Sequence, residues 1–148
     1  LVGTSMAKVT ALWNKCNRPK SAETIHEIFG KNLPTPCVTR WNSLFDALRC
    51  LLAFPLEKIN DAMECLNLPK LKENEHEFLL EYCKSLEPIA IAIDVCQAEH
   101  TSYYGMAIPV LQKLRKQLIA LQEKNLKYCA PVVTCALKGL NKRFKSKF

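Results

Sequence analysis

Apolar residues recur at intervals of three or four positions along most of the 148-residue chain, which is the spacing of one face of an α-helix. Signals for strands are rare, because β-branched residues seldom alternate with polar ones and neither Asn-Gly nor Asp-Gly occurs. The pattern predicts an all-α fold: a multi-helix bundle with two or three long antiparallel helices and short connections.

Prolines, glycines and capping residues divide this pattern into helical segments. In the first half of the chain we expect an apolar helical stripe from Val9 to Cys16, a helix from Ser21 to Gly30, and a helix capped by Thr39 that breaks near Pro55 and continues from Leu56 to Leu66. In the second half we expect a long helix that starts at Asn74 and Glu77, a helix capped by Thr101 or Ser102, and a last helix from Pro131. Pro88 falls inside the long segment, whose apolar stripe continues from Leu79 to Cys96. We expect a kink there and an uninterrupted buried face.

Length and composition fit one folded domain. The chain is 49% hydrophobic and 24% charged, unlike a disordered protein, and no internal repeat or linker is evident. We therefore expect a single helical domain over residues 1–148. Because the sequence starts at Leu1 without an initiator Met, we expect it to be a fragment of a larger protein.

The eight cysteines and three histidines lack metal-ligand spacing, since neither a Cys-x-x-Cys nor a His-x-x-x-His pair occurs. We expect reduced cysteines that fill a core, no metal site and no cofactor in this chain. The sequence also contains no apolar run of 18 residues and no signal-peptide pattern, so it predicts an intracellular protein without a membrane segment.

The net charge of +7 is unevenly distributed. Residues 1–40 carry six Lys or Arg against two acids and residues 113–148 carry ten against one, whereas residues 41–112 carry five against eleven. If the two basic ends meet in space, they form one positive face suited to a polyanion such as nucleic acid. The competing interpretation is that these charges only keep the surface solvated.

No grouping of residues indicates catalysis by this chain. Its isolated glycines exclude a phosphate-binding loop, and no local motif joins a nucleophile to a base. The only dense acidic cluster consists of Glu73, Glu75, Glu77 and Glu81. Its position near a helix start indicates macrodipole partners and a solvated face rather than ligands for a catalytic cation. We therefore expect that the chain is not an enzyme.

The segment 36–43, Pro-Cys-Val-Thr-Arg-Trp-Asn-Ser, combines groups suited to nucleic acid. Taken alone, it fits a loop, an N-cap and a helix start, with Trp41 packed into the core. In the functional interpretation, Arg40 contacts phosphates or base edges and the indole of Trp41 stacks on an unpaired base.

Residues 39–43, Thr-Arg-Trp-Asn-Ser, followed by Phe-Asp-Ala-Leu at 45–48, resemble the Thr-Arg-Trp-Asn-Ser segment of the hAT transposase superfamily, which includes domesticated BED-finger relatives. Flanking segments are similar to that family as well: residues 13–21 and 27–28 before the motif, and residues 86–89, 99–104 and 108–111 after it. The resemblance runs from about Met6 to Phe144, nearly the whole chain.

The resemblance implies a role in DNA transposition. In that family an RNase H-like catalytic domain is interrupted by a large helical insertion that contains the Arg-Trp motif, so this chain corresponds to that insertion or its first part. The catalytic carboxylates then lie outside the chain, and the parent protein binds Mg²⁺ or Mn²⁺. Arg40 and Trp41 become the expected contacts to transposon-end DNA, in a nuclear protein.

Basic residues near the end of the chain are expected as further phosphate contacts: Lys138, Lys142, Arg143 and Lys145. Besides DNA, the expected partners are the remainder of the transposase and a second copy of the chain. One alternative is a non-catalytic helical module for protein–protein interaction or dimerisation, with the acidic region 41–112 as its working surface. Another is a self-contained nuclease, which is disfavoured because no converging carboxylates are visible.

Overall fold

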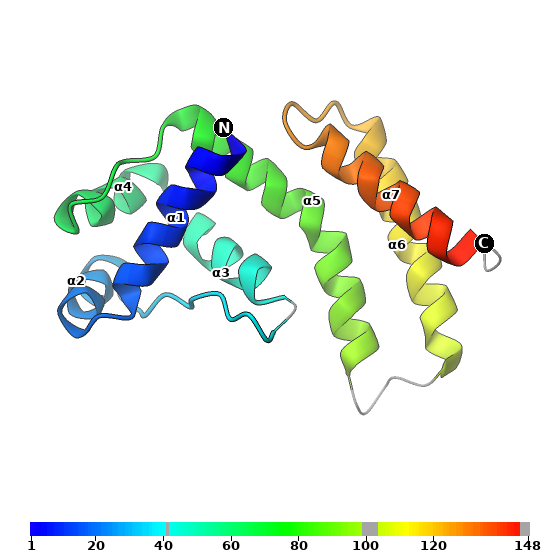
Figure 1. Cartoon of the computed structure of the whole chain (residues 1–148), viewed down its shortest axis with the longest axis horizontal. Coiled ribbons are helices and arrows are strands. Elements are labelled where there is room, and N and C mark those ends of the chain that lie inside the picture. The colour runs from blue at the N-terminus through cyan, green and yellow to red at the C-terminus, as the bar shows by residue number, and fades with distance from the viewer. Residues whose placement is uncertain (41, 99–103, 146–148) are drawn as a thin grey trace. The chain divides into compact units, whose positions relative to one another are not determined.

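The computed structural model describes residues 1–40, 42–98 and 104–145. Its helices are α1 (Val2–Cys16), α2 (Pro19–Phe29), α3 (Ser43–Leu52), α4 (Leu56–Cys65), α5 (Glu73–Gln97), the short 3₁₀-helix η1 (Tyr104–Met106), α6 (Ala107–Glu123) and α7 (Ala130–Phe144). No strand occurs in the described ranges, which confirms the prediction of an all-α fold (Figure 1).

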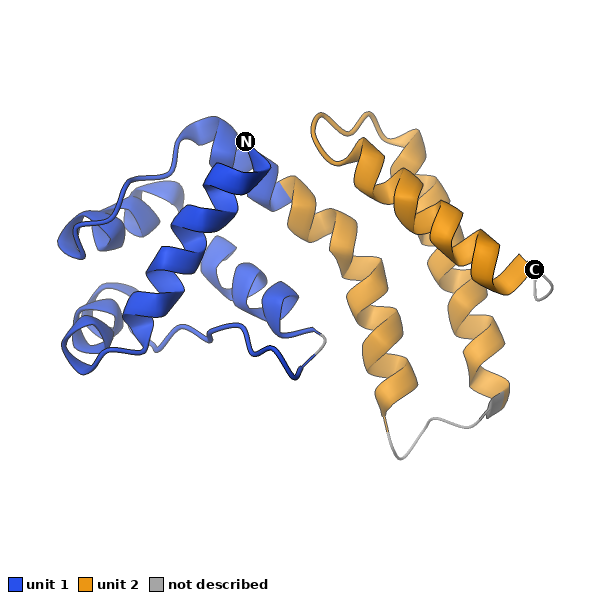
Figure 2. Ribbon diagram, viewed as in Figure 1, with its two compact units in different colours: residues 1–80 blue, residues 81–148 orange. Residues whose placement is uncertain are grey.

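The chain divides into two compact units, Leu1–Leu80 and Glu81–Phe148, here called unit 1 and unit 2 (Figure 2). The boundary falls within α5, so the first turns of that helix belong to unit 1 and the remainder belongs to unit 2. A single domain over residues 1–148 stays a prediction.

The core of unit 1 is built from the apolar stripes of its helices. α1 packs against α2, and α2 packs against α4. Large side chains that are buried here include Val9, Leu12, Trp13, Ile25, Phe29, Leu48, Leu51, Ile59, Met63 and Leu79. All of them occupy apolar positions expected from the helical spacing, because burying one face of each helix against the others removes the most apolar surface from water.

Helix α2 begins earlier than expected and ends where expected. It starts at Pro19, two residues before Ser21, because the fixed φ of proline suits the first helical position and its missing N–H has no intrahelical partner there. Gly30 ends the helix with a φ of +72°, and its N–H donates to the carbonyl of His26 at 2.8 Å. This left-handed conformation favours glycine and confirms the expected stop.

Helix α3 begins later than expected. Its N-cap position is Asn42 and its first helical residue is Ser43, so the expected cap at Thr39 is wrong. The residues around Thr39 form a turn instead, in which the N–H of Arg40 donates to the carbonyl of Cys37 at 3.3 Å. The carbonyl oxygen of Arg40, which in a longer helix would accept the N–H four residues later, instead accepts the N–H of Ser43 at 3.2 Å.

The start of α5 is fixed by Glu75, which is almost completely buried. The N–H of Lys72 donates to its carboxylate at 2.9 Å, and the Lys8 ammonium lies 2.7 Å from the same oxygen. This is the acidic half of a capping box, formed by Glu75 and not by the expected pair Asn74 and Glu77. Burial alone raises the pKa of Glu75, but the Lys72 N–H and the Lys8 ammonium together hold it below its usual value.

Unit 2 is organised around an apolar cluster between α6 and α7. Leu114 and Leu118 of α6 pack with Val133 and Leu137 of α7, and apolar side chains of α5 pack against them. The two helices are joined by the loop 124–129 and lie side by side (Figure 1). The periodic leucines of these segments therefore form the expected core contacts.

The helix starts in unit 2 were predicted in part. α7 begins one residue before Pro131, as expected for a proline in a first turn. α6 begins at Ala107 after the N-cap position Met106. Thr101 and Ser102, the caps expected for this helix, lie outside the described residues.

Glu81 holds the loop that leads into α7. Its carboxylate accepts the N–H groups of Lys127, Tyr128 and Cys129 at 3.1, 2.7 and 2.6 Å. Burial is the largest influence on its pKa and raises it, but the three N–H donors together lower the pKa below its usual value. The interpretation of Glu81 as part of a solvated face is therefore wrong, because the carboxylate replaces water for three backbone donors.

Helix α5 continues through Pro88, but its apolar face does not stay buried. Leu79 is fully buried, Ile93 is half-buried and Cys96 is exposed. The expected uninterrupted buried face is therefore wrong beyond Pro88. The second half of α5 keeps apolar surface that its neighbours in the described residues do not cover.

All eight cysteines are reduced thiols. Cys83 and Cys129 are buried, as expected for core residues, and burial raises the pKa of Cys129 to about 11. The exposed ones contradict the expectation that the cysteines fill a core: Cys37, Cys65, Cys96 and Cys135. Helical spacing alone does not show which apolar position a neighbouring helix covers.

Candidate nucleic-acid interface

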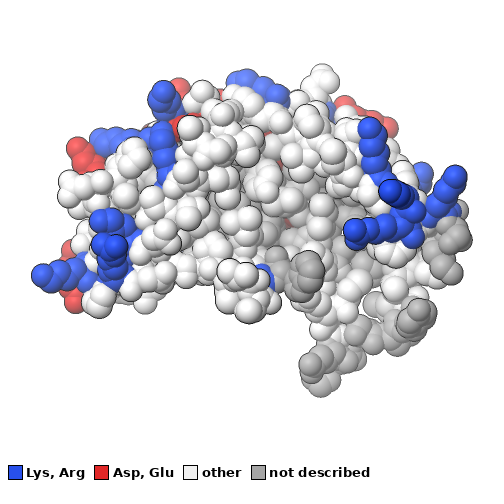
Figure 3. All heavy atoms as spheres, in the orientation of Figure 1, with Lys and Arg blue, Asp and Glu red and all other residues white. Residues whose placement is uncertain are grey.

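One side of α7 carries a row of basic side chains. Lys138, Lys142 and Lys145 are exposed and follow each other at intervals of four and three residues, so they lie on the same side of the helix and its last turn. We call these three residues the α7 basic row. Lys and Arg side chains gather over the C-terminal part of α7 in Figure 3.

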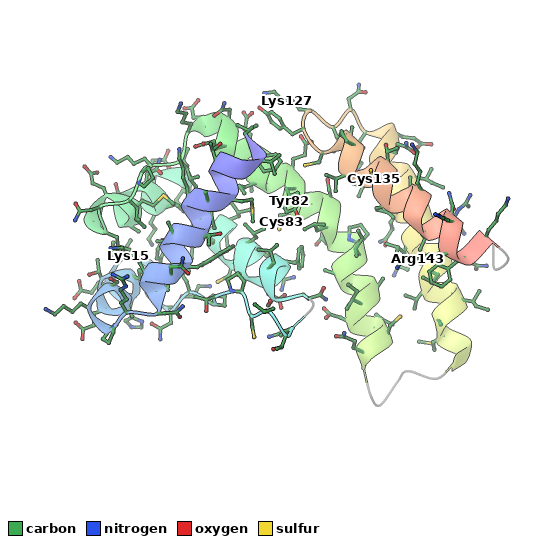
Figure 4. All side chains as sticks on the ribbon, in the orientation of Figure 1. Lys15, Tyr82, Cys83, Lys127, Cys135 and Arg143 are labelled. Atoms are coloured by element: carbon green, nitrogen blue, oxygen red, sulfur yellow. The ribbon has the colours of Figure 1, made fainter. Side chains whose placement is uncertain are left out.

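The orientation of α7 keeps the basic row in solvent. Val133 and Leu137 are buried and fix which side of the helix faces the core. The sequence of α7 contains no Asp or Glu that could neutralise the row. Arg143 is also exposed, but it lies five positions after Lys138 and hence about 140° around the helix from it. Of the four residues of α7 and its end that were expected to contact phosphates, the three lysines share one side of the helix and Arg143 points to another. Figure 4 labels Arg143 at the end of α7.

Arg115 joins the basic row from α6. Its Nε donates to the Oδ1 of Asn141 at 3.1 Å, and Asn141 directly precedes Lys142. Sequence reasoning missed Arg115, because the run Lys113-Leu114-Arg115-Lys116 gives no indication of which basic residue turns toward α7. Its bond to Asn141 requires the two helices to be packed together.

Part of the charge on α7 has a structural explanation. Lys142 and Arg143 lie in the last turn, where cations stabilise a helix by opposing the negative end of its macrodipole. Unit 2 as a whole nevertheless carries eleven Lys or Arg against five Asp or Glu over residues 81–148. The excess is larger than helix capping needs and produces a positive potential suited to anions.

Ser43 organises the turn that contains the Arg-Trp motif. Its Oγ accepts the N–H of Cys37 at 2.9 Å, and its single O–H lies within donating distance of the carbonyl oxygens of Cys37 and Arg40, at 2.7 and 2.8 Å. The serine of the motif thus fixes the backbone on both sides of Thr39. This role was not expected from the sequence, in which Ser43 was only the last residue of the motif.

Arg40 extends from this turn into solvent. Its side chain is 72% exposed and lies 3.0 Å from the carboxylate of Asp46, which is 32% exposed. The turn borders a hollow of about 410 Å³ whose lining includes Val38, Thr39 and Leu44. Trp41, the expected stacking residue, lies outside the described residues. The side chain of Arg40 is therefore accessible to a ligand, while its backbone is fixed by the turn.

Cys37 adds an exposed thiol to the same turn. Its Sγ lies 3.1 Å from the hydroxyl of Thr39, and this hydrogen bond is the largest influence that lowers the pKa of the thiol. The positive charge of Arg40 lowers the pKa further. Sequence reasoning placed Cys37 among the core cysteines, and only its position in the turn shows that it is exposed.

The expected contact residues fall into both units. Arg40 belongs to unit 1, and Lys138, Lys142, Arg143 and Lys145 belong to unit 2. The structure brings Arg115 together with the α7 basic row through its hydrogen bond to Asn141. A common face formed by the two ends of the chain stays a prediction.

Neither a group of metal ligands nor a helix fit to span a membrane occurs in the described part of the chain. No three or more His, Cys, Asp or Glu side chains there are grouped so that they could hold a metal ion. Within the same residues, no helix has both the length and the apolar character needed to cross a bilayer.

Comparison with models of known protein families, with curated proteins and with solved structures gave no match for this chain. We therefore infer its function from its own residues and from the resemblance in its Thr-Arg-Trp-Asn-Ser motif.

Proposed function

We propose that this chain is the helical insertion of a hAT-type transposase, or of a host protein derived from one, and that it binds DNA beside a catalytic core located outside the chain. The observation that carries this proposal is the α7 basic row, three exposed lysines on one side of a helix without any acid. Such a row neutralises backbone phosphates independently of base sequence.

Arg40 supplies the second argument. A guanidinium presents planar, paired donors that match phosphate oxygens better than an ammonium does. Arg40 is exposed and projects from a turn held by Ser43, so little freedom is lost when it binds. Trp41 follows it directly in the chain, and we propose that its indole stacks on an unpaired base at a DNA end.

In the proposed protein, α5, α6 and α7 form an antiparallel bundle, and both units together make up one insertion within an RNase H-like fold. The chain itself performs no catalysis, and the parent protein supplies the carboxylates together with Mg²⁺ or Mn²⁺. A nuclear protein that works with the remainder of the transposase, and as a homo-oligomer, fits this role.

Titration of labelled hairpin DNA at several salt concentrations tests the proposal. Replacing the α7 basic row by Lys138→Gln, Lys142→Gln and Lys145→Gln removes three phosphate contacts. The slope of log Kd against log salt should then fall by roughly 3 for duplex DNA. The control Lys58→Gln, Lys70→Gln and Lys72→Gln removes the same charge from the region where acids outnumber bases.

The control variant should keep the slope of the unmodified chain. If the full chain has no affinity for hairpin DNA at low salt, or if both triple variants lose the same amount, DNA binding by α7 is refuted.

A further inference from the structure

Helices α5 and α6 enclose an apolar groove within unit 2 that is separate from the α7 basic row. Its volume is about 260 Å³. On α5 it is lined by Pro88, Ile91, Ala92 and Val95, which follow each other at the spacing of one helix face. This is the part of α5 whose apolar side chains are left partly uncovered.

The α6 wall has the same periodic construction. Its lining residues run from Met106 to Gln117, a distance of about 16 Å or three helical turns, and include Val110 and Lys113. The floor includes Leu114, which is buried in the unit 2 core, and Ala92, which packs against that core. The groove therefore rests on side chains that belong to the unit 2 core or pack against it.

Exposure of a large apolar side chain indicates that the groove is a binding surface. Ile91 in its lining is 44% exposed. A concave site lined mainly by apolar side chains is typical of ligand-binding pockets. A groove three turns long between two helices fits an amphipathic helix with apolar anchors at positions i, i+3, i+4 and i+7.

The positive charge of Lys113 and of unit 2 indicates which kind of partner the groove favours. Lys113 is an exposed cation on the wall of the groove. Unit 2 carries eleven Lys or Arg against five Asp or Glu, so a second copy that docked here through its own unit 2 would bring two strongly positive units together. A partner with carboxylates gains attraction where a second copy meets repulsion.

We propose that the groove binds an acidic amphipathic α-helix of another protein, with the apolar stripe of that helix between α5 and α6 and a carboxylate against Lys113. This function is independent of DNA binding, because the lining residues do not include any member of the α7 basic row.

Two synthetic amphipathic helices with the same leucine stripe provide the probe, one with glutamate and the other with lysine at its polar positions. Fluorescence anisotropy with the full chain should show saturable binding of the glutamate helix and at least tenfold weaker binding of the lysine helix. Equal affinity for the two helices, or binding of neither, refutes the proposal.

A matched pair of variants locates the binding surface. Val110→Glu places a carboxylate inside the groove and should weaken binding of the glutamate helix at least tenfold. Ile108→Glu makes the same change on the same helix at a residue outside the groove lining and should leave the affinity within about twofold. Equal effects of these two variants refute the location.

Lys113→Glu provides a test that does not disturb the fold, since Lys113 is exposed whereas Val110 is half-buried. It should weaken binding of the glutamate helix about threefold or more and strengthen binding of the lysine helix. Self-association of the unmodified chain that Val110→Glu abolishes would assign the groove to a second copy and overturn the proposal. The α7 triple glutamine variant should keep its affinity for the glutamate helix while losing DNA, so the two proposals can fail separately.

Discussion

The guanidinium of Arg40 lies 3.0 Å from the carboxylate of Asp46, and both side chains reach solvent. An exposed ion pair of this kind contributes at most about 1 kcal/mol, since water and salt screen it. Arg40 can therefore exchange Asp46 for a phosphate at little cost. The pair positions the guanidinium next to the motif without burying it.

Removing the competing carboxylate should strengthen DNA binding. We expect Asp46→Asn to raise the affinity for hairpin DNA two- to fivefold, equivalent to at most about 1 kcal/mol, because Arg40 loses its internal partner and the DNA loses a repelling charge. Asp61→Asn, an exposed acid on α4, is the control and should change the affinity less. An anisotropy titration measures both, and lower affinity of Asp46→Asn would contradict the role of Arg40.

Loss of the Ser43 hydroxyl should loosen the turn that carries Arg40. We expect Ser43→Ala to lower the free energy of unfolding by about 1–3 kcal/mol, because the N–H of Cys37 loses its acceptor in a partly buried site. DNA affinity should fall as well, since Arg40 is no longer held in place. Ser21→Ala on α2 should be close to neutral in urea denaturation. If DNA affinity is unchanged in Ser43→Ala, the fixed turn is not needed for binding.

The three hydrogen bonds between the Glu81 carboxylate and the loop before α7, here called the Glu81 clamp, should depend on the negative charge of that carboxylate. Glu81→Gln keeps the size of the side chain but replaces one acceptor oxygen by an amide that donates. We expect a loss of about 1–3 kcal/mol in urea denaturation, since one or more of the N–H groups of Lys127, Tyr128 and Cys129 loses its acceptor. Glu87→Gln, at an exposed position of the same helix, should cost less than about 0.5 kcal/mol. Equal losses in the two variants would contradict the clamp.

Stability should fall in acid because the pKa values of Glu75 and Glu81 are lowered by folding. A carboxyl whose pKa is lower in the folded state contributes stability that is fully present above its unfolded pKa of about 4.5 and is lost as the pH falls through its folded value. Urea denaturation between pH 6 and pH 3 should show this loss. Glu75→Gln should make the dependence on pH shallower, and an unchanged slope would contradict the ionised Lys8–Glu75 pair.

His76 should cause a separate loss of stability at a higher pH than the loss caused by Glu75 and Glu81. Burial lowers the pKa of its imidazole below the ordinary value of 6.5, even though Glu57 and Glu77 act in the opposite direction. Its Nε2 is buried and has no hydrogen-bond partner among the described residues, so the neutral ring fits the fold better than the charged one. Stability should therefore start to fall as the pH drops below about 6.5, where the unfolded chain takes up a proton first. His76→Leu should flatten the curve between pH 7 and pH 5 in urea denaturation.

The helices and most of their core residues could be predicted from the sequence. Val9, Leu48 and Leu118 occupy apolar positions at helical spacing, and all three are buried. Gly30 and Pro131 mark a helix end and a helix start where they were expected. These features depend on backbone conformation and on neighbours one turn away, which the local sequence contains. The lysines of α7 were expected as phosphate contacts from the excess of basic residues at the end of the chain, and the structure shows that they are exposed.

The tertiary structure decided the features that join distant parts of the chain. Glu81 accepts the N–H of Cys129, 48 residues later, and Arg115 donates to Asn141, 26 residues later. The groove on α5 likewise depends on which apolar positions α6 leaves uncovered. Periodicity gives the direction of a side chain about its own helix axis, whereas its partner depends on how the helices pack. For this protein the sequence determined which faces are apolar or basic, and packing determined which of those faces remain open to a ligand.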